Sequence, residues 1–528
     1  MNSHIKTYAV LSIVIFQITC SIYSLDLTDQ GYFFGNIDAW KSPYFFVTQG
    51  SASIISIFSY LFGDYAYSIS KITPGILILV LIWVFSWSFE TKEEKKQFLF
   101  YVVLLLPWYM RSSLSDWTYY STLTGFFLTL MILFTERFIK SRQDSLIHFF
   151  FSFLLLSIWV KITNIVFLIC IPVVFVYTKN KNTFLKNGVL WILIITTSAA
   201  YVFLNDNMLN YISTGMTSFI YFLKGSQSHS GNSLAAKNIQ GILLSGKASF
   251  IFCIYLFIQY YADKRHLKLS TLFNCLICGG FVYAQFKWAL IPDEGLFIFY
   301  LCVLTFLTFK KDTFQLTYIL TLIFLIFCSI GSSNGIKATF ISEPLIIFLI
   351  LRHFRPWKNP SYKFVTLFLV LSGVLYKINF PYRDQNRLNL DSVSKINNIK
   401  GIITSKKKLE VIDMIKSELP DLTKTEAIIY PSAPLLHHIL EISPYLDNPW
   451  INLYPPAMLN SLLVKKSQNK KPDVIIRLMQ NPRNRNWPNG STNLDRDLNR
   501  EAIEILDNFT LDTGLRLQKE NEYFKIYY

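Results

Sequence analysis

A short stretch near the amino end joins acids, aromatic residues and glycines directly after an apolar run. Residues 25–40 contain Asp26, Asp29 and Asp38. Carboxylates at the edge of a membrane are costly unless they are used. A carboxylate there can accept the proton of an attacking hydroxyl group, and burial beside aromatic side chains moves its pKa toward the useful range. We therefore expect Asp29 at the mouth of an active site that faces the outer side of a membrane, and we expect Asp26 and Asp38 to be solvated loop acids.

A second acid, Asp116, lies in another short outer loop, where it could converge with Asp29 over one cavity. Two such carboxylates suit a general base, or a metal clamp on a phosphate leaving group, so the pattern leaves a divalent cation open as a cofactor. The simpler alternatives are that Asp29 belongs to an ordinary turn and that Asp116 caps the helix that follows it.

The glycines of the first loop predict its shape. Gly31 and Gly35 accept backbone conformations that other residues resist, so the segment is expected to be a shaped loop rather than a continued helix. Gly31 and the neighbouring Tyr32 are the residues expected to shape it.

Basic residues on the outer side of a membrane need a reason, because positive charge normally stays inside. Lys161, Arg111, Lys337 and Arg383 are placed at such boundaries. Each could bind the phosphate of a lipid-linked donor, and an arginine would bind it with two parallel hydrogen bonds. Contact of the long side chain with lipid headgroups is the simpler alternative for any one of them.

The composition predicts a membrane protein with many spans. The 528 residues are 52% hydrophobic and only 16% charged. At about 20 apolar residues a span, the chain holds about thirteen helices, centred near residues 16, 79, 104, 128, 154, 167, 194, 254, 276, 301, 324, 347 and 369. The formal charge of +16 comes largely from short loops between these runs. It therefore reflects topology, with a cytoplasmic amino end, and nucleic acid is not expected as a partner.

Two domains follow from this topology. Residues 1–379 are predicted to be the membrane domain, with a catalytic outer loop at 26–52 and a second outer loop at 205–247 that holds a helix in the membrane interface. Residues 380–528 are predicted to be a small extracytoplasmic α/β domain. Its expected strands are 426–430, 473–477 and 523–527, its expected helices are 404–419 and 495–509, and 431–456 is expected to be a long ordered loop.

With these residues in view, the chain resembles the GT-C superfamily of integral membrane glycosyltransferases, in particular the protein O-mannosyltransferase and lipid A aminoarabinose transferase branch (glycosyltransferase family 39). The resemblance rests on Thr28-Asp29-Gln30-Gly31-Tyr32 after the first helix, on Asp116 and on the outer tail. Members often carry two adjacent acids in the first loop, whereas Gln30 follows Asp29 here.

The resemblance implies transfer of a sugar, a hexose or a pentose, from a polyprenyl-phosphate donor to a hydroxyl group of a glycan, lipid or protein acceptor at the outer face of a bacterial inner membrane. Asp29 would be the base, the lipid phosphate the leaving group, and the 205–247 helix a guide for the lipid. Two alternatives are a lipid-linked glycan polymerase or ligase, and a transporter or flippase without chemistry. A third is a scaffold whose tail binds the cell wall or a partner.

Overall fold

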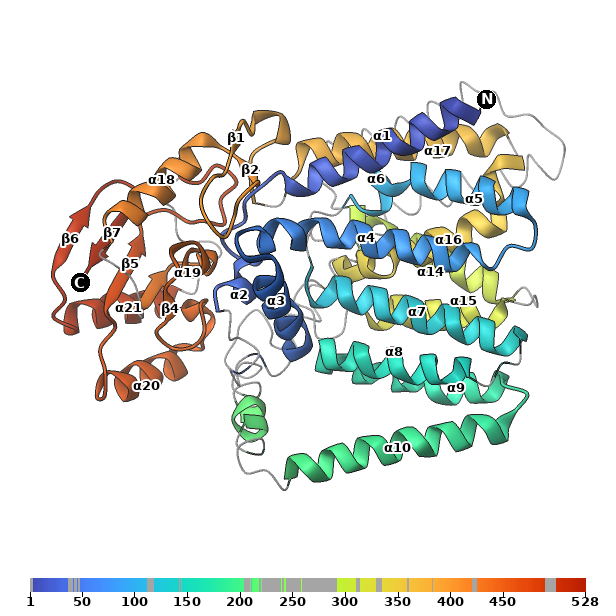
Figure 1. Ribbon diagram of the computed structural model, residues 1–528, viewed down its shortest axis with the longest axis horizontal. Helices are drawn as coiled ribbons and strands as arrows, with labels where there is room; N and C mark the ends of the chain where they lie inside the picture. The colour runs from blue at the N-terminus through green and yellow to red at the C-terminus, as the bar shows by residue number, and fades with distance from the viewer. Residues whose placement is uncertain are drawn as a thin grey trace.

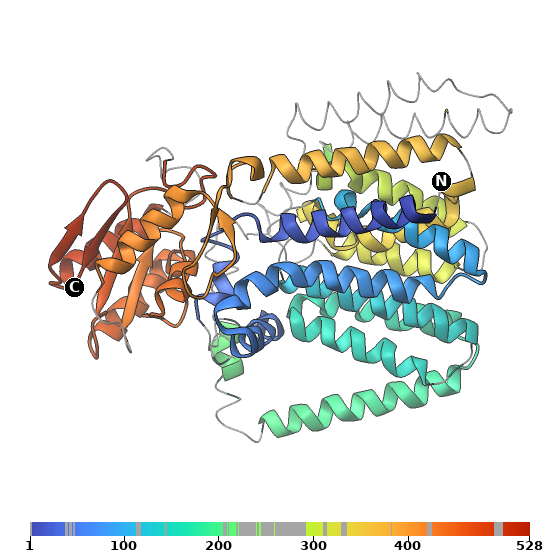
Figure 2. The ribbon, with the colours of Figure 1, turned by 45° about the horizontal axis from the view of Figure 1, so that its top comes forward.

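The structure is a computed structural model in which helices form one body and a small mixed sheet forms another. It describes residues 3–36, 41, 45, 48–111, 118–141, 143, 145–203, 209, 211–217, 220, 239, 242–243, 258, 292–309, 314–328, 335–358, 360–381, 383–419, 425–489 and 500–528. The helices lie side by side with roughly parallel axes, and the C-terminal domain covers one end of them (Figure 1, Figure 2).

The helical body is built from the apolar runs of the sequence. Among the described residues, three helices are long and apolar enough to cross a membrane: His4–Ile22, Gln49–Ser86 and Tyr120–Ser141. Shorter apolar helices lie beside them. The helices of this body are α1 (Ser3–Ile22), α2 (Gly31–Phe34), α3 (Gln49–Phe62), α4 (Ala66–Ser86), α5 (Lys92–Leu104), α6 (Leu106–Tyr109), α7 (Tyr120–Ser141), α8 (Leu146–Val160), α9 (Cys170–Tyr177), α10 (Lys181–Phe203), α14 (Pro292–Phe309), α15 (Gln315–Phe327), α16 (Glu343–Phe354) and α17 (Pro360–Asn379), with short 3₁₀ helices η3 (Gly63–Tyr65), η5 (Ile162–Ile169), η6 (Gly335–Ile341) and η7 (Pro356–Lys358).

Apolar side chains also cover the outside of this body. On α10, Val189, Ile192 and Leu193 are each more than half exposed. A soluble protein rarely leaves such a contiguous apolar surface in water, whereas the hydrocarbon of a bilayer accommodates it. We therefore treat the helical body as membrane-embedded. The expected helix centres fall within the helices described, except those near 254 and 276, which lie outside the described residues.

The C-terminal domain holds a five-stranded sheet with the order β4-β3-β5-β7-β6. The first three strands are parallel, and β7 runs antiparallel to both β5 and β6. Alternate residues of the strands face two layers of helices, so Ile429 and Ile476 pack toward α18 and α19 while Ile428 and Ile475 pack toward α20 and α21. The elements are η8 (Arg387–Asn389), β1 (Ser392–Val393), β2 (Ile403–Thr404), α18 (Lys406–Ser417), β3 (Glu426–Tyr430), α19 (Leu435–Leu440), β4 (Ser443–Pro444), η9 (Ile451–Leu453), α20 (Pro456–Ser467), β5 (Val474–Leu478), α21 (Arg500–Asp512), β6 (Leu517–Glu520) and β7 (Phe524–Tyr527).

The apolar core runs without a break from the helices into this domain. Leu27 and Phe34 of the first loop belong to the same buried cluster as Val411 of α18 and Leu435 of α19. The expectation that 431–456 is a loop was wrong in part, because α19 lies within it and packs on α2. This contact brings the C-terminal domain directly against the loop that holds Asp29.

Candidate active site in the first loop

The loop after α1 is ordered by its own first acid. Asp26 accepts hydrogen bonds from the Thr28 amide at 3.0 Å, the Thr28 hydroxyl at 2.6 Å and the Gln30 amide at 3.0 Å. An aspartate at this spacing closes a turn and supplies acceptors to the free amides before a helix, which here is α2. Asp26 is fully buried, so the expectation of a solvated acid was wrong. Burial raises the pKa of its carboxyl group, the Asp29 charge raises it further, and the Arg383 charge opposes both.

Other elements hold the same loop from outside. The Ser24 amide donates to the Ile403 carbonyl at 2.8 Å, and the Leu435 amide donates to the Leu27 carbonyl at 3.0 Å. Lys71 of α4 donates to the Ser24 carbonyl at 2.6 Å. The loop is therefore fixed between the membrane helices and the C-terminal domain.

Asp29 lies at the open side of this loop. Its carboxylate Oδ2 is 2.8 Å from Nη2 of Arg383, and the two side chains are 29% and 19% exposed. Arg383 also donates from Nη1 to the Thr28 hydroxyl. Arg383 comes from the segment that leaves α17 for the C-terminal domain, so two of the residues predicted from the sequence meet here although 354 positions separate them.

Tyr120 and Lys161 continue this site into the helical body. Tyr120 begins α7, close enough to Asp29 for the charges of the two groups to interact. The ammonium group of Lys161 lies 4.8 Å from the centre of the Tyr120 ring, and Lys161 is 5% exposed. Within the part of the chain that the structure describes, Lys161 forms no ion pair. A buried cation in this position attracts an anion strongly, because solvent screens it little.

The glycines serve a different purpose from the one expected. Gly31 and Gly35 have helical rather than left-handed backbone, with φ −62° at Gly35. A Cβ atom on Gly31 would lie 2.2 Å from the Leu435 nitrogen, and one on Gly35 would lie 2.4 Å from the Pro434 carbonyl oxygen. Both positions therefore need glycine because α2 and α19 approach backbone to backbone.

Tyr32 fixes the other side of the loop. Its ring lies 4.7 Å from the Phe45 ring and 6.2 Å from the Trp450 ring. Burial raises the pKa of its hydroxyl group, and the nearby Tyr120 hydroxyl raises it further. Tyr32 thus connects the first loop both to the residues that follow it and to the C-terminal domain.

Arg111 differs from the other predicted cations. Its guanidinium group donates to Glu343 at 2.6 Å and to the Trp108 carbonyl at 2.7 Å, and Tyr300 also bonds Glu343. Arg111 and Glu343 are each 1% exposed. The expectation that Arg111 binds a donor phosphate is therefore corrected, because its charge is already balanced in a sealed site.

Several predicted residues lie outside the described part of the chain. These are Asp38, Asp116 and most of the 205–247 loop, of which residues 211–217 are helical. The side chain of Lys337, within η6, is also outside it. No cluster of three or more histidine, cysteine, aspartate or glutamate side chains that could hold a metal ion occurs among the residues described.

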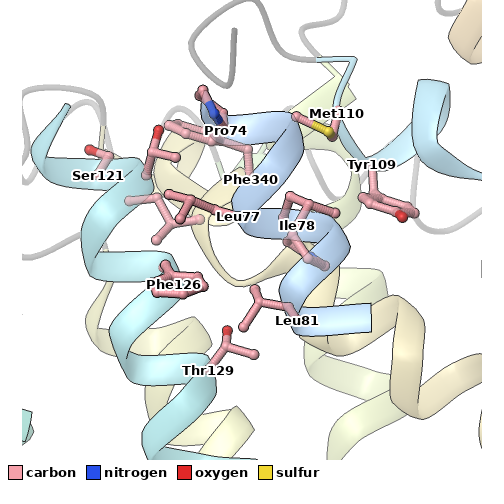
Figure 3. Close-up of a pocket in the computed structure, with 14 residues that line it drawn as sticks. Pro74, Leu77, Ile78, Leu81, Tyr109, Met110, Ser121, Phe126, Thr129 and Phe340 are labelled. Carbon is pink, nitrogen blue, oxygen red and sulfur yellow. The ribbon is translucent and has the colours of Figure 1, made fainter. Parts of the chain in front are cut away.

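A small, mostly apolar pocket lies between α4 and α7 (Figure 3). Ser121, the neighbour of Tyr120 in the chain, lies in its upper part with Pro74 and Met110, and Leu81 and Thr129 lie at its lower end. Sequence patterns did not predict this pocket, because its walls come from α4, α6, α7, η6 and α16, which are far apart in the chain.

Sequence reasoning also missed the residues that hold the loop. No motif surrounds Tyr120, Asp384 or Lys408 in the sequence. In the fold, Tyr120 lies near Asp29, and Asp384 and Lys408 bond the backbone of Leu25. A usable signal was the spacing of Gly31 and Gly35, since glycines four positions apart are typical of helices that pack closely.

Comparison with known proteins finds similarity to solved structures only. No protein-family model matches the sequence, and no curated protein matches it. Oligosaccharyltransferase from Archaeoglobus fulgidus, in complex with zinc and sulfate, matches with a TM-score of 0.45 and 10% identity, over 89% of this chain and 68% of that one. ArnT from Cupriavidus metallidurans, bound to undecaprenyl phosphate, matches with a TM-score of 0.43 and 10% identity, over 99% of this chain and 97% of that one.

Proposed function

We propose that this protein is a membrane glycosyltransferase that moves a sugar from a polyprenyl-phosphate donor to a hydroxyl acceptor, with Asp29 as the general base. The observation that carries the proposal is the contrast within one loop. Asp26 is fully buried and bonded to its own chain, whereas Asp29, three residues later, is presented at the open side with a cation beside it.

The arrangement can perform a single displacement. The acceptor hydroxyl gives its proton to Asp29 as its oxygen bonds to the anomeric carbon of the sugar. The bond from that carbon to the phosphate oxygen breaks, and its electron pair leaves with the lipid phosphate. The product is inverted at the anomeric carbon, and the proton on Asp29 then passes to water.

Cations near Asp29 support the departure of the phosphate. Arg383 offers a planar set of donors that matches a phosphate group, and Lys161 supplies a buried positive charge behind Tyr120. Groups of this kind stabilise charge that develops as the bond breaks. Lys337 and Asp116 stay candidates for the same site, as donor-phosphate ligand and second acid.

The rigid loop supports this assignment as well. A base must be held in place before the reaction, and groups with fixed surroundings act better than groups on mobile loops. Asp29 is carried by a segment whose neighbours bond to both bodies of the molecule. The bacterial inner membrane, with the Asp29 side outward, is the location we propose.

The test is transfer by purified protein. Protein in lipid vesicles is incubated with a radiolabelled polyprenyl-phosphate sugar and with membranes as a source of acceptor. Wild-type protein should move the label into acceptor material, and Asp29→Asn should reduce transfer by about 10²–10⁴-fold, the usual contribution of a general base.

Asp64→Asn is the matched control, because Asp64 is another half-buried acid at this end of the helices, but it lies in η3 and not in the first loop. It should transfer at the wild-type rate. Full activity in Asp29→Asn, with normal membrane insertion, would remove Asp29 as the base. Passage of the intact donor across the vesicle without covalent transfer would instead identify a flippase.

A further inference from the structure

One residue of the first loop is held by both members of a buried ion pair. The Leu25 amide donates to Oδ2 of Asp384 at 2.8 Å, and the Leu25 carbonyl accepts from Nζ of Lys408 at 3.0 Å. Asp384 and Lys408 are themselves 3.0 Å apart and are 0% and 2% exposed. The Asp384 carboxylate and the Lys408 ammonium group thus bond the backbone N–H and C=O of Leu25, four positions before Asp29. We call this pair the Leu25 clamp.

The rest of this clamp is also satisfied. Asp384 accepts from the Thr404 hydroxyl at 2.8 Å and from the Gln385 amide at 3.0 Å. Its carboxylate therefore has partners on both oxygens, drawn from β2, α18, the first loop and its own segment. Both charged residues belong to the C-terminal part of the chain, and what they hold belongs to the amino end.

Stability alone gives little reason for such a pair. Desolvating two charges costs about as much as their attraction returns, and apolar replacements are often equally stable. The pair instead contributes directional hydrogen bonds, and charge-assisted hydrogen bonds of this kind fix the position of the Leu25 backbone. Asp26 closes the turn between Leu25 and Asp29, so fixing the Leu25 backbone also restrains the position of Asp29.

We propose that Asp384 and Lys408 are positioning residues for Asp29, so that the C-terminal domain is a working part of the catalytic site. The catalytic half of this inference rests on the proposed function, and the structural half does not. The domain contributes Arg383 next to the base, the clamp on Leu25, and α19 against Gly31.

The experiment uses the full-length Asp384→Asn/Lys408→Met double variant, which removes both charges and leaves neither uncompensated. Two quantities are measured: hydrogen exchange of the amides of residues 24–30, and the kcat and KM of transfer. We expect exchange at least about tenfold faster in the loop, as local opening becomes easier. We expect kcat about 10–100-fold lower, because small misplacement of a reacting group is costly, with KM for the donor close to wild type.

The matched control is Arg477→Met/Asp507→Asn. This pair lies in the same domain with its charged atoms 2.7 Å apart, and it bonds Tyr430 rather than the first loop. It should change neither loop exchange nor kcat. Thr404→Val, which removes one bond to Asp384, is a milder second variant that should move both readouts in the same direction by less.

Unchanged exchange in residues 24–30 of both the double variant and Thr404→Val would overturn the clamp. A loosened loop with an unchanged kcat would overturn its catalytic role. If wild-type protein transfers no sugar, the proposed function fails, but hydrogen exchange still decides whether the pair holds the loop. Lower kcat with equally raised exchange throughout the whole domain would indicate general unfolding and would also count against positioning.

Discussion

Two arginines of this protein each face a carboxylate, and their surroundings differ. The Arg383–Asp29 pair has a separation of 2.8 Å with side chains 19% and 29% exposed. The Arg111–Glu343 pair has a separation of 2.6 Å with both side chains 1% exposed. The sequence presents both arginines in the same way, as cations at the outer ends of apolar runs.

The difference lies in how many other groups each pair engages. The Arg111 pair is closed by the Trp108 carbonyl and the Tyr300 hydroxyl, so it joins α6, α14 and α16. The Arg383 pair retains access to solvent, and a phosphate entering from that side can share the guanidinium group. The comparison teaches that solvent access, rather than residue type, distinguishes the sealed Arg111 from Arg383, for which we propose phosphate binding.

The most disruptive way to test this comparison is Arg111→Met. It leaves the Glu343 charge buried without its partner, which costs about 3–5 kcal/mol. The variant should show a strongly lowered melting temperature in detergent, or fail to give a monodisperse protein. The Arg111→Met/Glu343→Gln double variant removes both charges and should recover most of the loss. A single variant as stable as wild type would show that the sealed pair is not a structural joint.

Arg383→Met should separate activity from stability. We expect a normal melting temperature, since the pair is partly exposed and such pairs contribute little to stability. Transfer should fall by about 10²–10³-fold, the typical cost of removing one group that stabilises developing charge. Arg383→Lys should keep part of the activity, because it keeps the charge without the planar donors. The comparison would fail if Arg383→Met unfolded and Arg111→Met did not.

Gly31→Ala tests the contact between α19 and the loop that carries Asp29. The new Cβ atom would meet the backbone of Leu435, and overpacking of this kind costs about 1–3 kcal/mol. Both the melting temperature and the transfer rate should fall. Gly75→Ala is the control, because a Cβ atom there meets nothing within 4 Å in α4. Equal melting temperatures for the two variants would argue against close packing of α2 on α19.

The smallest expected effect is a dependence of stability on pH. Burial lowers the pKa of His437 to about 3 and that of His438 to about 4, and the His438 ring lies 5.2 Å from Phe34 of α2. In the unfolded chain the histidines have a pKa near 6.5, so below that pH the unfolded state binds more protons than the folded state. Stability should therefore fall as the pH drops from about 6.5 toward 4, with a loss of about 1 kcal/mol for each histidine already by pH 6.

Thermal unfolding measured across this pH range checks the sign. His438→Gln should make the curve shallower, since one titrating group is removed. A melting temperature that rises on acidification would contradict buried, neutral histidines at this joint. The sealed Arg111 pair contains no histidine, so its variants should keep the wild-type dependence.

Sequence reasoning succeeded where a single local pattern decides the structure. An apolar run of the right length gave α7 around Leu128, and β-branched residues gave β3 at Glu426–Tyr430. It failed where a distant segment decides. Asp26 looks like a surface acid, but in the fold it is buried near the Arg383 charge. Likewise, α19 is a short helix that packs against Gly31. Asp29 and Arg383 pair although most of the chain lies between them, and the residues around each of them in the sequence do not predict the pairing.

The clamp on Leu25 has a consequence for how the protein is made. Leu25 leaves the ribosome long before its partners, since 359 and 383 positions separate it from Asp384 and Lys408. Until those partners arrive, the two polar groups of the Leu25 backbone lack the charged groups that hold them in the complete chain. A chain interrupted before the last domain could still insert its helices, but its first loop would lack the Asp384 and Lys408 contacts. Under the proposed function, such a truncated chain would not transfer sugar, so activity would begin only after the C-terminal domain has been synthesised.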